Sequence, residues 1–269
     1  MNHANGAEER PSIAGVYDAA LGGSANTAAD RAMVEQARTA MPHIIQGARA
    51  NRGFLQRAVR YLAAEGRIGQ FLDLGSGMPT QRNTHQVVAE SRPDGRVVYV
   101  DNDPRVISVA GGLLRGADRT AVVHADIRDP EVVLNHPETR RLIDFDRPVA
   151  LLFIAVTHFL PDEDDPWGLV AAYVEAAAPG SYLALSAVTS DGQGERWQAV
   201  MQAGRPRGYE GFPRTRVEVE RFFAGLRIVP PYPGAEPAVA YVGMWGAGDT
   251  SPADDDGSRL AYAAVAGKP

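Results

Sequence analysis

The chain has 269 residues, of which 45% are hydrophobic and 22% charged, enough for one large domain or for one domain with an appendage. Its formal net charge of −6 argues against indiscriminate binding to nucleic acid, which needs a basic surface. The sequence has no cysteine, which excludes a disulfide framework, a thiolate zinc site and a cysteine nucleophile.

The first segment, residues 1–11, is polar and predicts a disordered tail without the apolar core of a signal peptide. The longest apolar run, residues 149–156, has the length of a buried strand, whereas a membrane span needs about 18 apolar residues. We therefore expect a cytoplasmic protein without a membrane partner.

A helical pattern follows from Ile13 to Tyr61, where apolar residues recur at three- and four-residue spacing. Gly22-Gly23 and Pro42 should divide this region into three helices. Because no strand pattern occurs here, residues 12–62 are predicted to form a helical lid on a second domain that spans residues 63–269.

Strand and helix patterns alternate in the second region. Strands are predicted at residues 68–75, 96–103, 120–129, 148–160, 180–190, 226–233 and 259–269, and helices at about 80–90, 104–114, 131–142, 166–177, 193–203 and 215–224. The strands are continuous apolar runs, which is typical of strands buried on both faces. This order predicts an α/β fold with a mostly parallel seven-stranded sheet and helices on both faces.

The loop after the first predicted strand reads DLGSGMPTQ, from Asp73 to Gln81. Gly75 and Gly77 permit a sharp turn and a close approach of the backbone to a ligand. Asp101 ends the second strand, 24 positions after Gly77, near the spacing at which a carboxylate binds a ribose diol. Together these features favour a nucleotide-like ligand, with a plain strand–helix connection as the alternative.

The third strand is followed by Asp126, which can accept a hydrogen bond from the exocyclic amine of an adenine. A dinucleotide is disfavoured, because Thr80 stands where the fingerprint G-x-G-x-x-G has its third glycine. Asp73 would also repel a pyrophosphate, whereas it suits a cationic ligand such as an amino group or a sulfonium.

The segments DLGSGMPTQ, VVYVDNDP, HADIRDP and AVTHFLPDEDDP resemble the Rossmann-like class I S-adenosylmethionine (SAM)-dependent methyltransferases. The N-terminal PSIAGVYDAALGGSANTAADR and RANRGFLQRAVRYLA are similar to signatures of an actinobacterial branch once grouped as a domain of unknown function. The resemblance covers residues 11–269 and implies SAM as cofactor, S-adenosylhomocysteine as product and a small-molecule methyl acceptor. It departs from the family pattern at Ser24, Ala25 and Thr27, where a lysine, an acid and an aromatic residue are usual.

The resemblance also implies roles for individual residues. Asp73, Gly75, Ser76 and Gly77 would hold the methionine part of SAM and Asp101 its ribose, while Asn102, Asp126 and Ile127 would contact adenine and Thr157 and His158 would line the methyl-transfer site. Each has a structural alternative, such as Asp73 or Asp126 capping a helix and His158 being a satisfied buried histidine.

The lid would contain Tyr17, Gly22, Gly23, Asn26 and Arg31, and Arg31 could pair with the SAM carboxylate through its guanidinium fork. Asn51 and Arg52 are similar candidates. If the acceptor needs a base, His158 is the first candidate, because histidine titrates near neutral pH, and Tyr17 is the second.

Three further expectations concern the rest of the chain. The acidic run at residues 162–165 is predicted to be a solvated loop before a helix, without a metal. Trp197, Trp245, Tyr209 and Phe212 are candidates for an apolar acceptor pocket, with ordinary core positions as the alternative. Competing functions are a non-catalytic SAM-binding protein and an NAD-dependent oxidoreductase.

Overall fold

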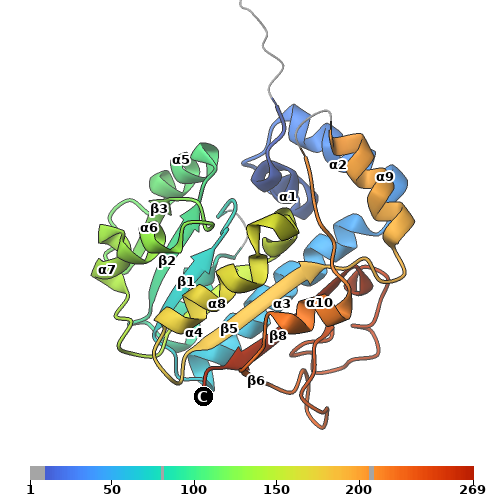
Figure 1. Ribbon diagram of the computed structural model, residues 1–269. Helices are drawn as coiled ribbons and strands as arrows, with labels where there is room; N and C mark the ends of the chain where they lie inside the picture. Colours follow the sequence, from blue (N-terminus) through green and yellow to red (C-terminus); the bar gives the residue numbers. More distant parts are fainter. Residues whose placement is uncertain (1–9, 80–81, 206–208) are drawn as a thin grey trace, which may run out of the picture.

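The computed structural model describes residues 10–79, 82–205 and 209–269, so most of the predicted tail lies outside the described residues. Its centre is an eight-stranded sheet in the order β3-β2-β1-β4-β5-β8-β6, with β7 paired to β8 (Figure 1). The strands are β1 (Gln70–Leu74), β2 (Arg96–Asp101), β3 (Thr120–His124), β4 (Ala150–Ile154), β5 (Tyr182–Val188), β6 (Arg227–Ile228), β7 (Ala240–Tyr241) and β8 (Ala261–Gly267).

The first five strands are parallel, and β8 runs antiparallel between β5 and β6. All seven predicted strands therefore exist, and β7 is an addition that is too short to show a pattern. The third, fourth and sixth strands end earlier than predicted, at His124, Ile154 and Ile228. The fourth ends there because Ala155 has a positive φ of 54° and a short 3-10 helix, η1 (Thr157–Phe159), follows.

The helices also follow the predicted alternation. They are α1 (Ile13–Leu21), α2 (Ala28–Ala40), α3 (Ile44–Ala64), α4 (Thr84–Ser91), α5 (Pro104–Leu113), α6 (Pro130–Asn135), α7 (Pro137–Leu142), α8 (Pro166–Ala176), α9 (Gly194–Gly204) and α10 (Arg216–Arg221). Asp-Pro pairs start α5, α6 and α8, with the aspartate as N-cap and the proline in the first turn. The single helix predicted at 131–142 is two helices, since Pro137 interrupts it.

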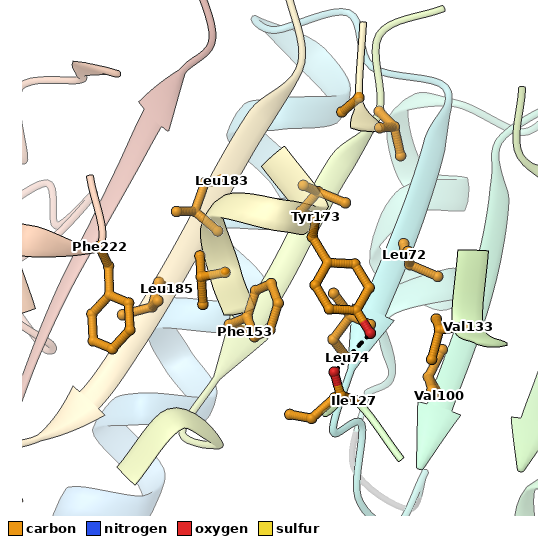
Figure 2. Close-up of a cluster of buried hydrophobic side chains, with 14 of the residues drawn as sticks. Leu72, Leu74, Val100, Ile127, Val133, Phe153, Tyr173, Leu183, Leu185 and Phe222 are labelled. Atoms are coloured by element: carbon orange, nitrogen blue, oxygen red, sulfur yellow. Dashed lines mark hydrogen bonds between the residues drawn. The ribbon is translucent and has the colours of Figure 1, made fainter. Parts of the chain in front are cut away.

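One face of the sheet is covered by α6, α7, α8 and α10, which share a buried apolar cluster with the strands (Figure 2). Tyr173 of α8 lies within this cluster, and its hydroxyl donates a hydrogen bond of 2.9 Å to the carbonyl oxygen of Ile127 (Figure 2). This bond fixes the loop that follows β3, where Asp126 and Ile127 were predicted to contact adenine.

The opposite face is covered by α3 and α4. Phe54 and Leu62 of α3 are completely buried and share a core with Phe71, Leu152 and Val265 of the sheet. Thus α3 forms a layer of the sheet domain, whereas α1 and α2 lie beyond the carboxyl ends of the strands, with α2 beside α9 (Figure 1). The domain boundary at residue 62 remains a prediction.

The first two helices are tied to the sheet domain by an ion pair. Asp30 in α2 is fully buried and accepts a hydrogen bond of 2.8 Å from the guanidinium of Arg105 in α5. Arg105 also donates to the Ser12 hydroxyl, which caps α1. Because α5 begins directly after β2, this contact links the N-terminal helices to the strand end that carries Asp101.

Candidate active site

A cavity of about 450 Å³ opens at the carboxyl ends of the strands. It is bounded by the loops after β1, β2, β3 and β4, by α1, α2 and the start of α3, and by α9. Of the predicted site residues it brings together Tyr17, Gly75, Ser76, Gly77, Asp101, Asn102, Asp126, Ile127 and His158. In a doubly wound sheet this edge, next to the switch from β1 to β4, is where ligands bind.

The glycine loop turns tightly over the end of β1. The backbone N–H groups of Gly75 and Ser76 both donate to the carbonyl of Val100, at 2.9 and 3.1 Å. Gly75 has a φ of 72°, and a Cβ on it would lie 2.3 Å from Cγ2 of Val156. Gly77 has a φ of 65° and open space around it. At position 75 a side chain would clash with Val156 and would also have to adopt a positive φ. At position 77 only the positive φ favours glycine.

Asp101 organises the turn after β2. One of its carboxylate oxygens accepts from the N–H of Gly77 at 2.8 Å, and the other accepts from the N–H of Asp103 at 2.9 Å. The side chain is buried, and this burial raises the pKa of Asp101. Each carboxylate oxygen has room for a second hydrogen bond, so Asp101 can still accept from two hydroxyls.

Asp126 lies across the same end of the cavity, but its carboxylate is already saturated. Oδ1 accepts from the backbone N–H and Nε of Arg128, at 2.9 and 3.0 Å. Oδ2 accepts from Nη2 of Arg128 and from Nδ2 of Asn102, at 2.7 and 3.1 Å. The bonds from Arg128 lower the pKa of Asp126 to about 2. A ligand amine can bind Asp126 only if one of these donors moves away.

Asp73 lies in β1 and does not line the cavity directly. Its Oδ2 accepts from the hydroxyl of Thr84 at 2.6 Å. Burial raises the pKa of Asp73 to about 6, although the Thr84 bond and the charge of Arg52 oppose that shift. The carboxylate is thus a buried anion that a nearby cation would stabilise.

The two arginines considered for the SAM carboxylate lie in different places. Arg31 is exposed, does not line the cavity, and donates to Oδ1 of Asn26 at 2.8 Å. Arg52 in α3 lies 5.7 Å from the centroid of the Tyr17 ring, and its charge acts on Asp73. Its Nε is buried and has no hydrogen-bond partner among the described residues.

Tyr17 belongs to a hydrogen-bonded chain that crosses the cavity wall. Its hydroxyl donates to the carbonyl of Ala48 at 3.2 Å and accepts from Nδ2 of Asn51 at 2.8 Å. Oδ1 of Asn51 then accepts from the hydroxyl of Ser186 at 2.6 Å, and that hydroxyl accepts from the N–H of Ala155. Burial raises the pKa of Tyr17, so it is a neutral hydroxyl at pH 7.

His158 lines the cavity from η1, but the expectation that it titrates near neutral pH is wrong. Burial lowers the pKa of His158 to about 3, and the charge of Arg214 adds to the shift. The N–H of Val188 lies 3.5 Å from Nδ1, a long hydrogen bond that favours the tautomer with its proton on Nε2. At pH 7 His158 is therefore a neutral group that presents an N–H donor.

Thr157, also in η1, is fully buried behind His158 and does not line the cavity. Its carbonyl accepts from Nη1 of Arg214 at 2.9 Å, while Nη2 of Arg214 donates to the carbonyl of Leu160 at 2.8 Å. Arg214 holds the turn that positions His158, yet a lone arginine before α10 has no motif, so sequence analysis missed it. Ser186, within an apolar strand, was missed for the same reason.

The acidic run lies before α8, as predicted, but its first three residues form a short 3-10 helix, η2 (Asp162–Asp164), instead of a loop. Its three aspartates have structural partners. Asp162 pairs with Arg214 at 3.1 Å, Asp164 pairs with Arg128 at 3.5 Å, and Asp165 caps α8. In the part of the chain that the structure describes, no group of three potential metal ligands occurs. Of the aromatic candidates, Trp197 and Tyr209 line the cavity. Trp245 instead packs edge-to-face against two core rings.

The sequence profile described as S-adenosyl methyltransferase matches residues 3–269. The chain belongs to this family. A protein from Thermobifida fusca, described provisionally as a methyltransferase, is 42% identical, with 96% of this chain and 95% of that chain covered and a TM-score of 0.88. A DUF574 family protein from Streptomyces avermitilis is 39% identical, with 97% and 98% covered and a TM-score of 0.89. No curated protein is a significant match.

A more distant structure shows only the shared fold. It is an O-methyltransferase family 2 protein from Planctomyces limnophilus, 18% identical, with 90% of this chain and 67% of that chain covered and a TM-score of 0.50. The predicted α/β Rossmann-like class I methyltransferase fold is confirmed, as are the family and SAM as its cofactor. No helix among the residues with a described structure is long and apolar enough to cross a membrane.

The site of this S-adenosyl methyltransferase has groups that suit SAM. The hydroxyl of Ser76 is buried without a partner among the described residues, between two glycines that keep the loop free of side chains. Asp101 ends β2 with free acceptor capacity, and Asp73 is a buried anion at the end of the strand that precedes the glycine loop. The family assignment rejects the NAD-dependent alternative. Side chains do not fill the cavity beside the glycine loop, which favours an enzyme over a non-catalytic SAM-binding protein.

Proposed function

We propose that the protein transfers the methyl group of SAM to a small-molecule acceptor that enters the same cavity. The observation that carries this proposal is the continuity of the cavity, which joins the glycine loop and Asp101 to a space beneath α2 and α9. A cofactor held by the strand ends would leave that second space for an acceptor.

In this proposal the nucleoside lies over β2 and β3. Asp101 accepts from the two ribose hydroxyls, because its oxygens keep that capacity while they hold Gly77 and Asp103. Ile127 packs against the adenine ring. Asn102 moves away from Asp126 to make room for the exocyclic amine, because it donates one hydrogen bond of 3.1 Å to this carboxylate. Arg128 donates three shorter bonds to Asp126 and also pairs with Asp164, so it stays in place.

The methionine part lies over the glycine loop. Gly75, Ser76 and Gly77 line its path, with the unpartnered Ser76 hydroxyl available to it. Asp73 favours the ammonium group. Neither arginine lines the cavity. Arg52 binds the carboxylate in place of Arg31, because its Nε is buried without a partner among the described residues and its charge acts on Asp73, whereas Arg31 is exposed and already bonded to Asn26.

SAM supplies a methyl group that its sulfonium already activates. The protein has to orient the reactants and keep water out. Tyr17, Asn51 and Ser186 fix α1 and α3 against β5, which sets the width of the cavity. His158 contributes a neutral N–H at the transfer site and is no base there, because its pKa is about 3.

The test is calorimetric titration of the purified protein with SAM, S-adenosylhomocysteine and NAD, followed by methyl-transfer assays with a panel of small molecules. We expect micromolar binding of the first two ligands, no binding of NAD, and transfer to a small acceptor. Transfer only to protein or nucleic acid would overturn the proposal. We also propose that the protein is cytoplasmic. The reaction subclass depends on which atom of the acceptor receives the methyl group, and the same assays would identify that atom.

A further inference from the structure

The two ends of the cavity differ in charge. Among the described residues that line it, the charged side chains are Asp101, Asp103, Asp126 and Arg128, and all of them follow β2 or β3. The other end lies beside β5 and β8, beneath α2 and α9. Its walls are formed by Met33, Val34 and Ala37 of α2 and by Trp197, Val200 and Met201 of α9.

These walls belong to two separate apolar clusters. Met33 and Val34 pack with residues of α1, whereas Ala37, Trp197 and Val200 pack around Leu260. Both clusters face the same cavity, so an occupant would be surrounded by apolar side chains. Desolvating an unpaired charge there is strongly unfavourable, whereas burying apolar surface there is favourable.

Two polar groups at this end are hydrogen-bond donors. The indole N–H of Trp197 is buried and has no partner among the described residues. His158 accepts from Val188 through Nδ1, which leaves its Nε2 with the proton. An unpaired buried N–H is destabilising, and a ligand oxygen that accepts from it would remove that penalty.

Aromatic rings stand beside these donors. Phe159 and Tyr209 both line the cavity and pack edge-to-face with ring centroids 5.9 Å apart. Burial raises the pKa of the Tyr209 hydroxyl to about 12, so this ring stays uncharged at neutral pH. Flat rings pack well against such walls.

We propose that this end of the cavity binds an uncharged, mainly apolar ring compound with a hydrogen-bond-accepting oxygen, and that compounds of this class are the methyl acceptors. The proposal rests on the proposed function, because it assigns the second space of the cavity to the acceptor. It excludes acceptors that carry a carboxylate, a phosphate or an ammonium group in this region.

The experiment compares 2-naphthol with 2-naphthoate, which share one ring system and differ in charge at pH 7. Each is titrated calorimetrically into the full-length protein saturated with S-adenosylhomocysteine. We expect 2-naphthol to bind at least tenfold more tightly. We also expect Trp197→Phe to weaken naphthol binding severalfold through loss of the N–H donor.

A designed charge provides a second test. Met201 is partly buried in the apolar wall, so Met201→Lys places an ammonium group there. We expect this variant to prefer 2-naphthoate to 2-naphthol. Val217→Lys is the control, since Val217 is 68% exposed and does not line the cavity, and it should keep the original preference. Unchanged S-adenosylhomocysteine affinity and melting temperature would show that each variant is folded.

Equal binding of the two probes, or a preference for the naphthoate in the unmodified protein, would overturn the proposal. So would an unchanged preference in a folded Met201→Lys variant. These failures differ from failure of the proposed function, which would appear as no binding of S-adenosylhomocysteine. In that case the same probes titrated into the free protein still test the apolar end.

Discussion

Backbone groups and carboxylates at the ends of β1, β2 and β3 line one end of the cavity, whereas apolar side chains of α2 and α9 line the other. The first end depends on short segments that are hydrogen-bonded to each other. The N–H groups of the loop Gly75–Gly77 donate to the last two residues of β2, Val100 and Asp101. The second depends on helices that are far apart in the chain. The end at β1, β2 and β3 is therefore specified by local sequence, whereas the apolar end, which we propose binds the acceptor, is a product of tertiary packing.

The largest effect on cofactor binding is expected from a substitution at Asp101. Asp101→Ala removes the acceptor for two ribose hydroxyls and releases the N–H groups of Gly77 and Asp103. A loss of about 3 kcal/mol corresponds to roughly 100-fold weaker binding of S-adenosylhomocysteine. Calorimetry measures this loss, with the exposed Asp94→Ala as control. Unchanged affinity in Asp101→Ala would mean that the nucleoside binds elsewhere.

The two glycines of the loop form a matched pair. Gly75→Ala places a methyl group 2.3 Å from Cγ2 of Val156 at a φ of 72°, whereas Gly77→Ala meets nothing within 4 Å at a φ of 65°. We expect Gly77→Ala to lower the free energy of unfolding by about 1–2 kcal/mol through backbone strain, and Gly75→Ala to cost roughly 1–3 kcal/mol more. Urea unfolding measures both. Equal losses in the two variants would show that the contact of the added methyl group with Val156 does not destabilise the Gly75→Ala protein.

The pH dependence of SAM binding tests Asp73. Its pKa is about 6 in the free protein, and the SAM ammonium should favour the ionised form. Affinity should therefore be highest near pH 7 and should fall as the pH drops through 6, by up to about tenfold per pH unit, because the carboxyl must first lose a proton. Asp73→Asn should bind more weakly at pH 7 and lose this dependence. An identical pH profile in Asp73→Asn would assign the titration to another group, such as Asp101.

The smallest effect is expected at the contact between the N-terminal helices and α5. Arg105→Ala removes the bonds to Asp30 and Ser12, which should lower the free energy of unfolding by about 1–2 kcal/mol. Binding of S-adenosylhomocysteine should weaken severalfold, because α5 follows Asp101. Arg31→Ala is the matched control, since Arg31 is exposed and outside the cavity. A larger loss of affinity in Arg31→Ala would restore the predicted role of Arg31.

The features that were correctly predicted are those determined by residues close together in the sequence. The alternating strands and helices, the break of the N-terminal region into three helices and the strand-end carboxylates all depend on neighbouring residues, such as Gly22-Gly23 or the Asp-Pro pairs. The premature end of β4 was not predictable, since the apolar run continues past Ile154 to Val156.

Residues that act across the fold were harder to predict. Arg214 holds η1 from a distance of more than fifty residues, and Ser186 bonds to Asn51 across the sheet. The perturbed pKa of His158 arises from burial and from Arg214, neither of which the sequence shows. Trp197 and Tyr209 were named as acceptor candidates together with Trp245 and Phe212, and only the first two line the cavity.

The most direct test of this account is a crystal structure of the protein with S-adenosylhomocysteine bound. The account predicts that the ribose bonds to Asp101, that the amino acid part lies over Gly75–Gly77, and that the sulfur faces the space between α2 and α9. A nucleoside beneath α9, or a sulfur directed away from that space, would contradict the division of the cavity into a cofactor end and an acceptor end.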